Sequence, residues 1–459
     1  MGKLILEHAL LPEGWATEVV VDLDAAGRIE SVEAGGDVRG GERVRGAVVP
    51  GMPNLHGHAH QRAIVGRTQR AGPAGDSFWT WRAAMYRALI RMTPEAFEAI
   101  AAQCYVELLE GGYTAIGEFH YLHHQADGRP YDAPAELGLR ALAAARRTGI
   151  GVTLLPALYA ASDFGGAAPT EGQRRFVCDG ELFARIVDAL SAAARGDPNA
   201  SVGIAPHSLR AVPPELLAET VCWWHGLERE GRVHIHVAEQ RREVEACLAW
   251  SGRRPVEWLL EHQPVDARWC PIHCTHLTPA ETTDLAASGA VVGLCPTTEA
   301  DLGDGLFPAR AFLDAGGRFG VGSDSHVSAD LAAELRLLEY GQRLTGEARC
   351  MLADAPGGST ARVLLARALA GGAQALDREI GAIAPGRRAD LVTLDLEDPT
   401  LAGSEGDGWL DAWIFGARRS PVRAVRVGGR LVVEDGRHVA GEAIAADFRR
   451  AMRSLELAS

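Results

Sequence analysis

The chain has 459 residues, of which 47% are hydrophobic and 23% charged, so it is long enough to form one large domain and a smaller one. Its net charge of −14 and its lack of any basic block argue against a nucleic-acid partner, because such binding requires cations that neutralise phosphates. No apolar run reaches the roughly 18 residues of a membrane span, and the N-terminus lacks the residue order of a signal peptide. We therefore expect a cytoplasmic protein without a membrane partner.

Residues 1–48 consist of short β-prone runs joined by glycine-rich turns, as in "TEVVVDLDAAGRIESVEAGG". The same pattern returns in residues 377–459, in "GRRADLVTLDL" and "VRAVRVGGRLVVEDGRHVAG". These two segments predict one small β-sandwich domain that is built from both ends of the chain.

Residues 49–376 alternate short apolar runs with amphipathic helical segments such as "TPEAFEAIAAQCYVELLEGG" and "PPELLAETVCWWHGLERE". The strand candidates are the run at 48–58 and then "TAIGEFH", "GVTLLPALY", "SVGIAPHS", "VHIHVAEQ", "CPIHCTH", "AVVGLCPTT" and "RFGVGSDSH". Because most of these eight runs are separated by a helix, the pattern predicts an α/β fold with a (β/α)8 barrel of the TIM type rather than an open sheet.

Polar residues suited to metal binding fall at the ends of six of these strand candidates. They are His56 and His58, Glu118 and His120, His207, His236 and Glu239, His273 and His276, and Asp324 and His326. In a (β/α)8 barrel all strand C-termini open onto one face, which is where active sites form. Imidazole and carboxylate groups together suit zinc or iron(II). The sequence therefore predicts a metal centre at this face.

Single histidines also have a purely structural interpretation. A lone histidine at a strand end is more often a core or rim residue than a ligand, and we interpret His120, His124 and His326 in this way. His234 shares a strand face with His236 but lies two residues deeper, so we expect it to pack beneath the site. The "CPIHCTH" run lacks a second Cys or His pair at zinc-finger spacing, and we expect the eight cysteines to be reduced core thiols.

Four motifs, taken together and in order, resemble the amidohydrolase superfamily. They are "PGMPNLHGH" in the first strand, "HVAEQ" in mid-barrel, "HCTHL" one unit later and "SDSH" at the eighth strand. The terminal β domain with "APGRRADLVTLDL" is similar as well, so the resemblance covers nearly the whole chain. More narrowly, "NLHGHAHQRA", "WTWRAAMY", "GEFHYLHH", "APHSLRAVPP" and "LCPTTEADLGDGLFP" resemble the formimidoylglutamate deiminase family.

The resemblance implies the residues of a metal centre. The implied metal ligands are His56, His58, His236 and Asp324, and His60 falls outside the motif. Glu239 matches a proton-shuttling carboxylate and His273 a histidine that orients the attacking water, so the implied catalytic residues are Glu239, His273 and Asp324. Relatives with two metals need a bridging lysine after the fourth strand, whereas this chain has "APHSLRA" there and Lys3 as its only lysine. One divalent ion, Zn²⁺ or Fe²⁺, is therefore implied.

The narrower resemblance implies hydrolysis of N-formimidoyl-L-glutamate to N-formyl-L-glutamate and ammonia, a step of histidine degradation. Arg82 and Arg210 are the best candidates to bind the two carboxylates of this substrate, because guanidinium pairs with carboxylate through two parallel hydrogen bonds. Gln61, Tyr121 and His207 follow the first, second and fourth strands and are expected to complete the pocket.

Three alternative functions remain open from the sequence. A deaminase of guanine, adenosine or another aromatic ring would share the metal residues but would have little use for two arginines. A hydantoinase or dihydroorotase would normally require the missing lysine, and a non-catalytic scaffold would predict a broken ligand set. For the assembly we expect a homodimer.

Overall fold

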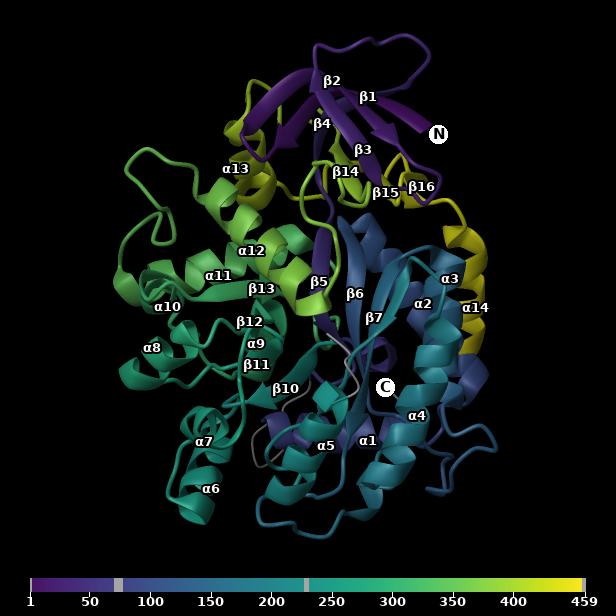
Figure 1. The fold of residues 1–459 in the computed structure, drawn as a ribbon, viewed down its shortest axis with the longest axis vertical. Coiled ribbons are helices and arrows are strands. Elements are labelled where there is room, and N and C mark those ends of the chain that lie inside the picture. The colour runs from purple at the N-terminus through teal and green to yellow at the C-terminus, as the bar shows by residue number, and fades with distance from the viewer. Residues whose placement is uncertain (1, 70–76, 227–230, 456–459) are drawn as a thin grey trace.

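The computed structural model describes residues 2–69, 77–226 and 231–455, and its centre is a ring of parallel β-strands (Figure 1). The ring strands are β5 (Met52–Gly57), β6 (Tyr113–His120), β7 (Gly151–Leu158), β8 (Ala200–Val202), β9 (Ala205–Pro206), β10 (Val233–Val237), β11 (Trp269–His273), β12 (Val291–Leu294) and β13 (Arg318–Val321). They are short, mostly buried runs, as expected for parallel strands that are covered on both faces.

Two parallel sheets make up this ring. One contains β5 to β8, with β9 paired to β7, and the other contains β10 to β13. Isolated bridges from Ile204 to Val233 and from Ser208 to His236 connect the first sheet to β10. A bridge from Gly57 to Asp324 connects the end of β5 to the residues that follow β13. The alternation of parallel strands and helices agrees with the predicted α/β class and brings the carboxyl ends of β5 and β13 together.

Helices follow most of the ring strands. They are α1 (Phe78–Leu89), α2 (Pro94–Glu110), α3 (Glu136–Thr148), α4 (Gly180–Ala194), α5 (Pro214–Gly226), α6 (Arg241–Ser251), α7 (Pro255–His262), α8 (Pro279–Ala287), α9 (Pro296–Leu302), α10 (Ala309–Asp314), α11 (Leu331–Gly346) and α12 (Thr360–Leu376), with short 3-10 helices η1 (Ala59–Ile64) and η2 (Glu171–Gln173). Several begin at side-chain caps that satisfy the first free amides, such as Thr93 before α2 and Asp179 before α4. No helix in the described ranges combines the length and apolar character that crossing a bilayer requires.

A separate eight-stranded sheet combines both ends of the chain, as predicted. It contains β1 (Gly2–Leu11), β2 (Gly14–Leu23), β3 (Ile29–Ala34), β4 (Glu42–Pro50), β14 (Leu391–Leu394), β15 (Val422–Val427), β16 (Arg430–Glu434) and β17 (Arg437–His438). The strand order is β17-β16-β15-β14-β4-β1-β2-β3, with β4 joining the two terminal segments. The pairings place all these strands in one sheet, so the two-layer sandwich stays a prediction.

The two C-terminal helices pack on the barrel, and the first of them also contacts this sheet, where Asp407 accepts a hydrogen bond of 2.9 Å from Trp15. Helix α13 (Asp407–Gly416) contacts α11 and α12, and α14 (Gly441–Ser454) contacts α2 (Figure 1). An ion pair of 2.5 Å joins Arg147 of α3 to Asp447 of α14. The C-terminal segment therefore connects the terminal sheet with the barrel through direct contacts.

Residues with strained backbone conformations are concentrated at the ends of the ring strands. Five non-glycine residues there have positive φ angles, namely Ala238 (53°), His273 (70°), Cys274 (50°), Asp324 (45°) and His326 (61°). Such conformations cost free energy and cluster at functional sites, where the surrounding structure holds them in place. The strained ends of β10, β11 and β13 thus indicate the functional face of the barrel.

The contact between α12 and β13 leaves no room for a side chain at Gly371. A Cβ atom at this position would lie 2.0 Å from the backbone oxygen of Phe319. We expect Gly371→Ala to lower the free energy of unfolding by about 1 to 3 kcal/mol, because one of the two elements must shift. Chemical denaturation measures this, with Gly416→Ala as the control, since a Cβ there meets only ordinary contact at 3.7 Å. Equal stability of the two variants would contradict the packing described here.

Candidate active site

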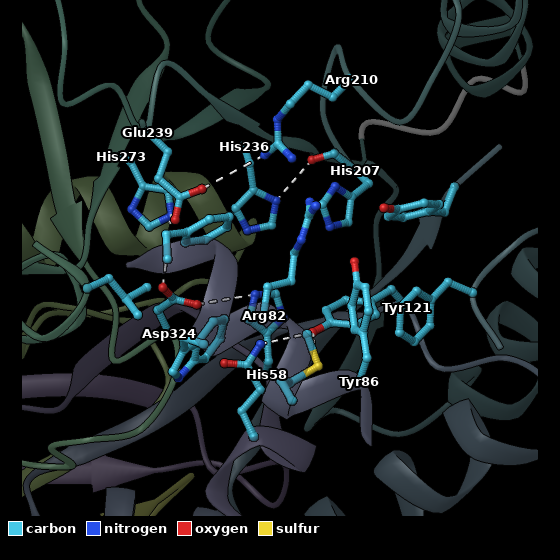
Figure 2. Close-up of a pocket in the computed structure, with 17 residues that line it drawn as sticks. His58, Arg82, Tyr86, Tyr121, His207, Arg210, His236, Glu239, His273 and Asp324 are labelled. Carbon is cyan, nitrogen blue, oxygen red and sulfur yellow. Dashed lines mark hydrogen bonds and ion pairs between the residues drawn. The ribbon is translucent and has the colours of Figure 1, made fainter. Parts of the chain in front are cut away.

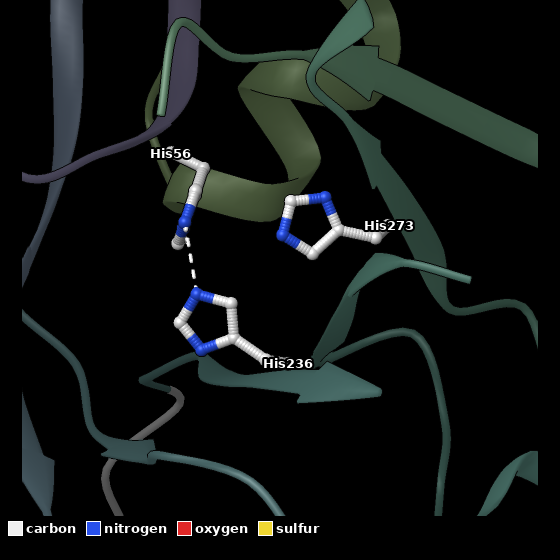
Figure 3. Close-up of side chains that lie close together, drawn as sticks. All are labelled: His56, His236 and His273. Carbon is white, nitrogen blue, oxygen red and sulfur yellow. Dashed lines mark hydrogen bonds between the residues drawn. The ribbon is translucent and has the colours of Figure 1, made fainter. Parts of the chain in front are cut away.

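Four potential ligand side chains converge at the carboxyl ends of β5, β10 and β13. The Nε2 atoms of His236 and His56 lie 3.2 Å apart, and the Oδ1 atom of Asp324 lies 3.4 Å from His56 Nε2 and 3.2 Å from His58 Nε2. All four residues are buried. Figure 3 shows a ring nitrogen of His56 and one of His236 directed toward one another, with His273 beside them. The structure therefore brings together the four predicted metal ligands.

Backbone carbonyls fix the proton positions on two of these rings. The Nδ1 atom of His58 lies 2.8 Å from the oxygen of Phe119, and the Nδ1 atom of His236 lies 2.9 Å from the oxygen of His207. A carbonyl only accepts hydrogen bonds, so both Nδ1 atoms carry the proton. A histidine that carries its proton on Nδ1 presents the Nε2 lone pair to the cluster. This arrangement of second hydrogen bonds is typical of metal-binding histidines.

The charges of the cluster fit a cation better than additional protons. Burial lowers the pKa of His56 to about 3 and that of His236 well below its usual value, so both rings are neutral. Burial raises the pKa of Asp324, but its contacts with His56 and His58 lower that pKa by more, so the carboxylate is ionised. The neutral His56 ring carries one proton, whereas its Nε2 atom lies near two acceptors, His236 Nε2 and Asp324 Oδ1. Three imidazole nitrogens and one carboxylate oxygen are donors that suit a divalent transition metal ion.

His273 and Glu239 lie beside the ligand cluster, as predicted. The Nε2 atom of His273 lies 3.6 Å from Glu239 Oε1 and 3.9 Å from Asp324 Oδ2. Burial lowers the pKa of His273, but Glu239, Glu299 and Asp324 raise it to about 10. Burial raises the pKa of Glu239, against the opposing effects of His273 and Arg210. The pair therefore offers both a proton donor and a proton acceptor at the edge of the site.

Two acidic residues behind this pair were missed by the sequence analysis. Glu299 of α9 lies 3.3 Å from His273 Nδ1, and Asp304 contributes to one group with Glu239 and His273 in which potential ligand atoms lie within 4.8 Å of one another. Burial and the charge of Glu239 raise the pKa of Asp304 to about 9. Both residues belong to the quoted run "LCPTTEADLGDGLFP", but no role was assigned to them.

A pocket opens from the ligand cluster, and Figure 2 shows the side chains that line it. All five predicted substrate-binding residues line this pocket, namely Gln61, Arg82, Tyr121, His207 and Arg210. His58, His236, Glu239, His273 and Asp324 also line it. The predicted metal-binding, catalytic and substrate-binding residues therefore share one cavity.

Arg82 reaches the pocket from helix α1. Its guanidinium carbon lies 4.4 Å from the ring centre of Trp79 and 5.8 Å from that of Tyr86. Arg242 of α6 approaches the same Trp79 ring to 4.5 Å. In the described part of the chain no carboxylate pairs with Arg82. Its position therefore depends on aromatic packing, and its hydrogen-bond donors remain available to a ligand.

Arg210 is buried and lies between two carboxylates. Its guanidinium nitrogens lie 3.9 Å from Glu239 Oε2 and 3.8 Å from Glu243 Oε1. These distances exceed those of charge-assisted hydrogen bonds, which are about 2.7 to 2.9 Å. Within the described residues the Nε atom has no hydrogen-bond partner. Arg210 is thus a buried cation whose donors are incompletely satisfied, which is suited to an anionic ligand.

Gln61 and Tyr121 form a polar group on the β5 and β6 side of the pocket. The hydroxyl of Tyr121 lies 2.9 Å from Gln61 Nε2 and 2.9 Å from His60 Nε2. Among the described residues the Oε1 atom of Gln61 has no partner. His60 thus contacts a pocket residue rather than the ligand cluster, in agreement with its place outside the motif.

One face of helix α1 supplies pocket residues that the sequence analysis did not select. Phe78, Trp81, Met85 and Tyr86 line the pocket together with Arg82. Their spacing is the i, i+3, i+4, i+7 and i+8 pattern of one helical face, and this periodicity could have found them. Phe176, Tyr159 and Leu302 complete the lining from other elements.

The remaining histidines of interest lie outside the ligand cluster. His234 is buried and donates through Nε2 to the oxygen of Ala375 at 2.8 Å, beneath the site as expected. His124 Nε2 donates to the oxygen of Val177, and His326 Nδ1 pairs with the hydroxyl of Ser323. His120 is buried with its ring 5.3 Å from that of Phe97. Among the described residues no candidate metal-binding group contains a cysteine of the "CPIHCTH" run.

Comparison with known proteins agrees with this geometry. Residues 47–432 match the Amidohydrolase family. The chain belongs to the amidohydrolase family. Residues 6–46 match a second family, described as "Formimidoylglutamate deiminase HutF, N-terminal domain". The two matches together cover the ring of strands and most of the terminal sheet.

Individual relatives match this chain over nearly its whole length. A formimidoylglutamate deiminase of Pseudomonas aeruginosa is 50% identical over 455 residues, which cover 99% of this chain and 100% of that protein. The crystal structure of an amidohydrolase from Brucella melitensis superposes with a TM-score of 0.94 at 48% identity and covers 100% of both chains. An adenosine deaminase from Xanthomonas campestris with bound zinc shares the fold at a TM-score of 0.82 and 23% identity, with 99% and 98% of the two chains covered.

The ligand cluster predicts the metal content of substituted proteins. We expect alanine at His56, His58, His236 or Asp324 to remove most of the bound divalent metal, because each change removes one of four donor atoms. Glu239→Gln is the control, since Glu239 is placed beside the cluster as a proton carrier. Elemental analysis of the purified proteins measures the result. Full metal occupancy in the alanine variants would show that the ion binds elsewhere.

Proposed function

We propose that this site hydrolyses the amidine group of N-formimidoyl-L-glutamate to give N-formyl-L-glutamate and ammonia, in histidine degradation. The observation that carries the proposal is the pair of arginines, Arg82 and Arg210, in the same pocket as the histidine and carboxylate cluster. A substrate with two carboxylates and a hydrolysable carbon–nitrogen bond matches both halves of the pocket. The 50% identity to a formimidoylglutamate deiminase supports the assignment.

We further propose that His56, His58, His236 and Asp324 hold one zinc ion. The tautomers set by Phe119 and His207 support this, as does the zinc in the related adenosine deaminase structure. Iron(II) is an alternative with the same ligand preferences. When bound, such an ion lowers the pKa of water from 15.7 to about 7 and so makes hydroxide available at neutral pH.

The side chains around the cluster supply the proton transfers of this reaction. Asp324 and Glu239 accept the proton that is released when water adds to the amidine carbon. Glu239 delivers a proton to the nitrogen that leaves as ammonia, when the carbon–nitrogen bond breaks and the N-formyl group remains. His273 lies within 4 Å of both carboxylates and orients the water between them. These three residues are the catalytic residues of the proposal.

The charged end of the substrate occupies the other side of the pocket. Arg82 and Arg210 bind one carboxylate each, and Gln61, Tyr121 and His207 complete the contacts. Burial and the nearby arginines Arg210 and Arg82 lower the pKa of His207 well below its usual value, so its ring binds as a neutral hydrogen-bonding group. A planar purine carries no carboxylate, so a purine deaminase would leave both guanidinium groups without a partner.

The organisation of the whole chain enters the proposal as well. We place the domain boundaries at residues 1–48, 49–376 and 377–459, which is supported by the sheet that joins β4 to β14. A homodimer in the cytoplasm is the proposed assembly and location. The packing of α14 on α2 supports a fixed arrangement of the two domains.

The role of Glu239 predicts a separation of turnover from metal binding. We expect Glu239→Gln to lower kcat by about 10²- to 10⁴-fold, the usual contribution of general acid-base catalysis, because the amide neither accepts nor delivers the proton. Steady-state ammonia release together with elemental analysis measures both properties. A near-normal kcat in this variant would mean that another group carries the proton.

The two arginines predict the specificity of the pocket. Ammonia release from N-formimidoyl-L-glutamate should be faster than from guanine or adenosine, and methionine at Arg82 or Arg210 should lower kcat/KM with the metal retained. We expect a loss of about 2 to 5 kcal/mol per charge-assisted contact.

N-formimidoyl-glycine serves as the matched substrate, because it lacks the distal carboxylate. It should be poor with the unchanged enzyme and should lose further rate only in the variant whose arginine binds the α-carboxylate. Normal turnover of N-formimidoyl-L-glutamate by both variants, or faster turnover of guanine, would contradict the substrate assignment and leave the metal-dependent deaminase chemistry in place.

A further inference from the structure

Glu299 connects the first turn of α9 to the catalytic His273. Glu299 is 5% exposed, and its Oε1 atom accepts a hydrogen bond from the backbone amide of Cys295 at 2.9 Å. The same oxygen lies 3.3 Å from the Nδ1 atom of His273. The carboxylate is thus held by the backbone at the end of β12 and reaches the ring at the end of β11.

This contact determines which ring nitrogen of His273 faces the pocket. A carboxylate accepts hydrogen bonds, so His273 Nδ1 is the donor to Glu299. The Nε2 atom then lies at the pocket, 3.6 Å from Glu239 and 3.9 Å from Asp324, and has no hydrogen-bond partner among the described residues. The positive φ angle of 70° at His273 sets the backbone for this orientation. Without the carboxylate, the ring would lose the contact that directs its Nε2 atom.

We propose that Glu299 is the positioning residue of His273, holding the ring by its Nδ1–H group so that the Nε2 atom is directed at the reacting groups. Carboxylates that orient a catalytic histidine act in this way, by fixing the ring plane without touching the substrate. The inference rests on the proposed function, because it assumes that His273 takes part in catalysis. It adds one residue, behind the pocket, on which the rate of the chemical step depends.

A metal ion is the competing explanation for this group. The Sγ atom of Cys295 lies within 4.8 Å of potential ligand atoms of His273 and Glu299. Metal binding requires a thiolate, however, and burial raises the pKa of the Cys295 thiol well above its usual value. The direct contact between Glu299 and His273 also occupies the donor atoms. We therefore favour a hydrogen bond between the two side chains.

The substitution Glu299→Gln tests this role with little change in shape. The side-chain oxygen of glutamine still accepts from Cys295, but the negative charge is removed. We expect kcat to fall by about 10- to 100-fold, in the range measured for such supporting residues, with KM and metal content close to those of the unchanged holoenzyme. Glu334→Gln is the matched control. The buried Glu334 of α11 accepts a hydrogen bond from the amide of Thr297, which lies in α9 as Glu299 does, and it has no contact with His273.

A spectroscopic measurement makes the test independent of turnover. In the ¹⁵N-histidine-labelled holoenzyme, the Nδ1 proton of His273 should give a downfield imidazole resonance, assigned by its loss in His273→Asn. Glu299→Gln should move this resonance upfield, and Glu334→Gln should leave it in place. If N-formimidoyl-L-glutamate were not a substrate, the resonance would still report the contact, so failure of the proposed function is distinguishable.

Three results would overturn the inference. One is an unchanged resonance in Glu299→Gln, and another is a kcat equal to that of the unchanged enzyme. The third is the loss of a second equivalent of metal from this variant, which would identify Cys295, His273 and Glu299 as a metal site.

Discussion

The carbonyl oxygens of Phe119 and His207 each accept a hydrogen bond from the Nδ1 atom of a histidine, His58 and His236 respectively. Each contact leaves an Nε2 lone pair directed into a buried space that also contains the ionised Asp324. Lone pairs and a carboxylate at 3.2 to 3.4 Å repel one another unless a cation lies between them. The backbone at the ends of β6 and β9 therefore orients these histidines for a metal ion.

The substrate side of the pocket must bind an anion although the protein as a whole is acidic. The protein carries a net charge of −14, yet the proposed substrate is an anion with two carboxylates. Arg210 lies more than 3.5 Å from its carboxylate neighbours, and Arg82 packs on Trp79 rather than on an acid. Their donors are therefore kept available, while the aromatic face of α1 restricts how the Arg82 guanidinium is placed. The positive charge of the pocket therefore comes from where Arg82 and Arg210 are placed, since the chain as a whole is acidic.

The ligand cluster could be predicted from the sequence because its signals are local. His56 and His58 alternate along one strand, and the other ligands fall at strand ends, which a closed ring of parallel strands brings to one face. The class of fold followed from the same alternation of strands and helices. The sheet built from both ends of the chain was also predictable, because its turn-rich pattern appears in both terminal segments.

Glu299 and Asp304 could not be given roles in this way. Their positions depend on how the chain continues after β12 and on the packing of α9 against β11, which no periodicity in the sequence reports. The aromatic face of α1 is the opposite case, since its helical spacing is plain but only the structure shows that it lines the pocket.

The central claim is that one cation belongs between His56, His58, His236 and Asp324. An X-ray diffraction experiment on crystals of the purified holoenzyme, with data collected on both sides of the zinc absorption edge and of the iron edge, tests it most directly. Our account predicts one anomalous peak per chain, surrounded by the Nε2 atoms of the three histidines and by the carboxylate of Asp324. A peak of full occupancy at Glu239, His273 and Asp304 instead, or fully active crystals with no anomalous peak among the four ligands, would contradict it.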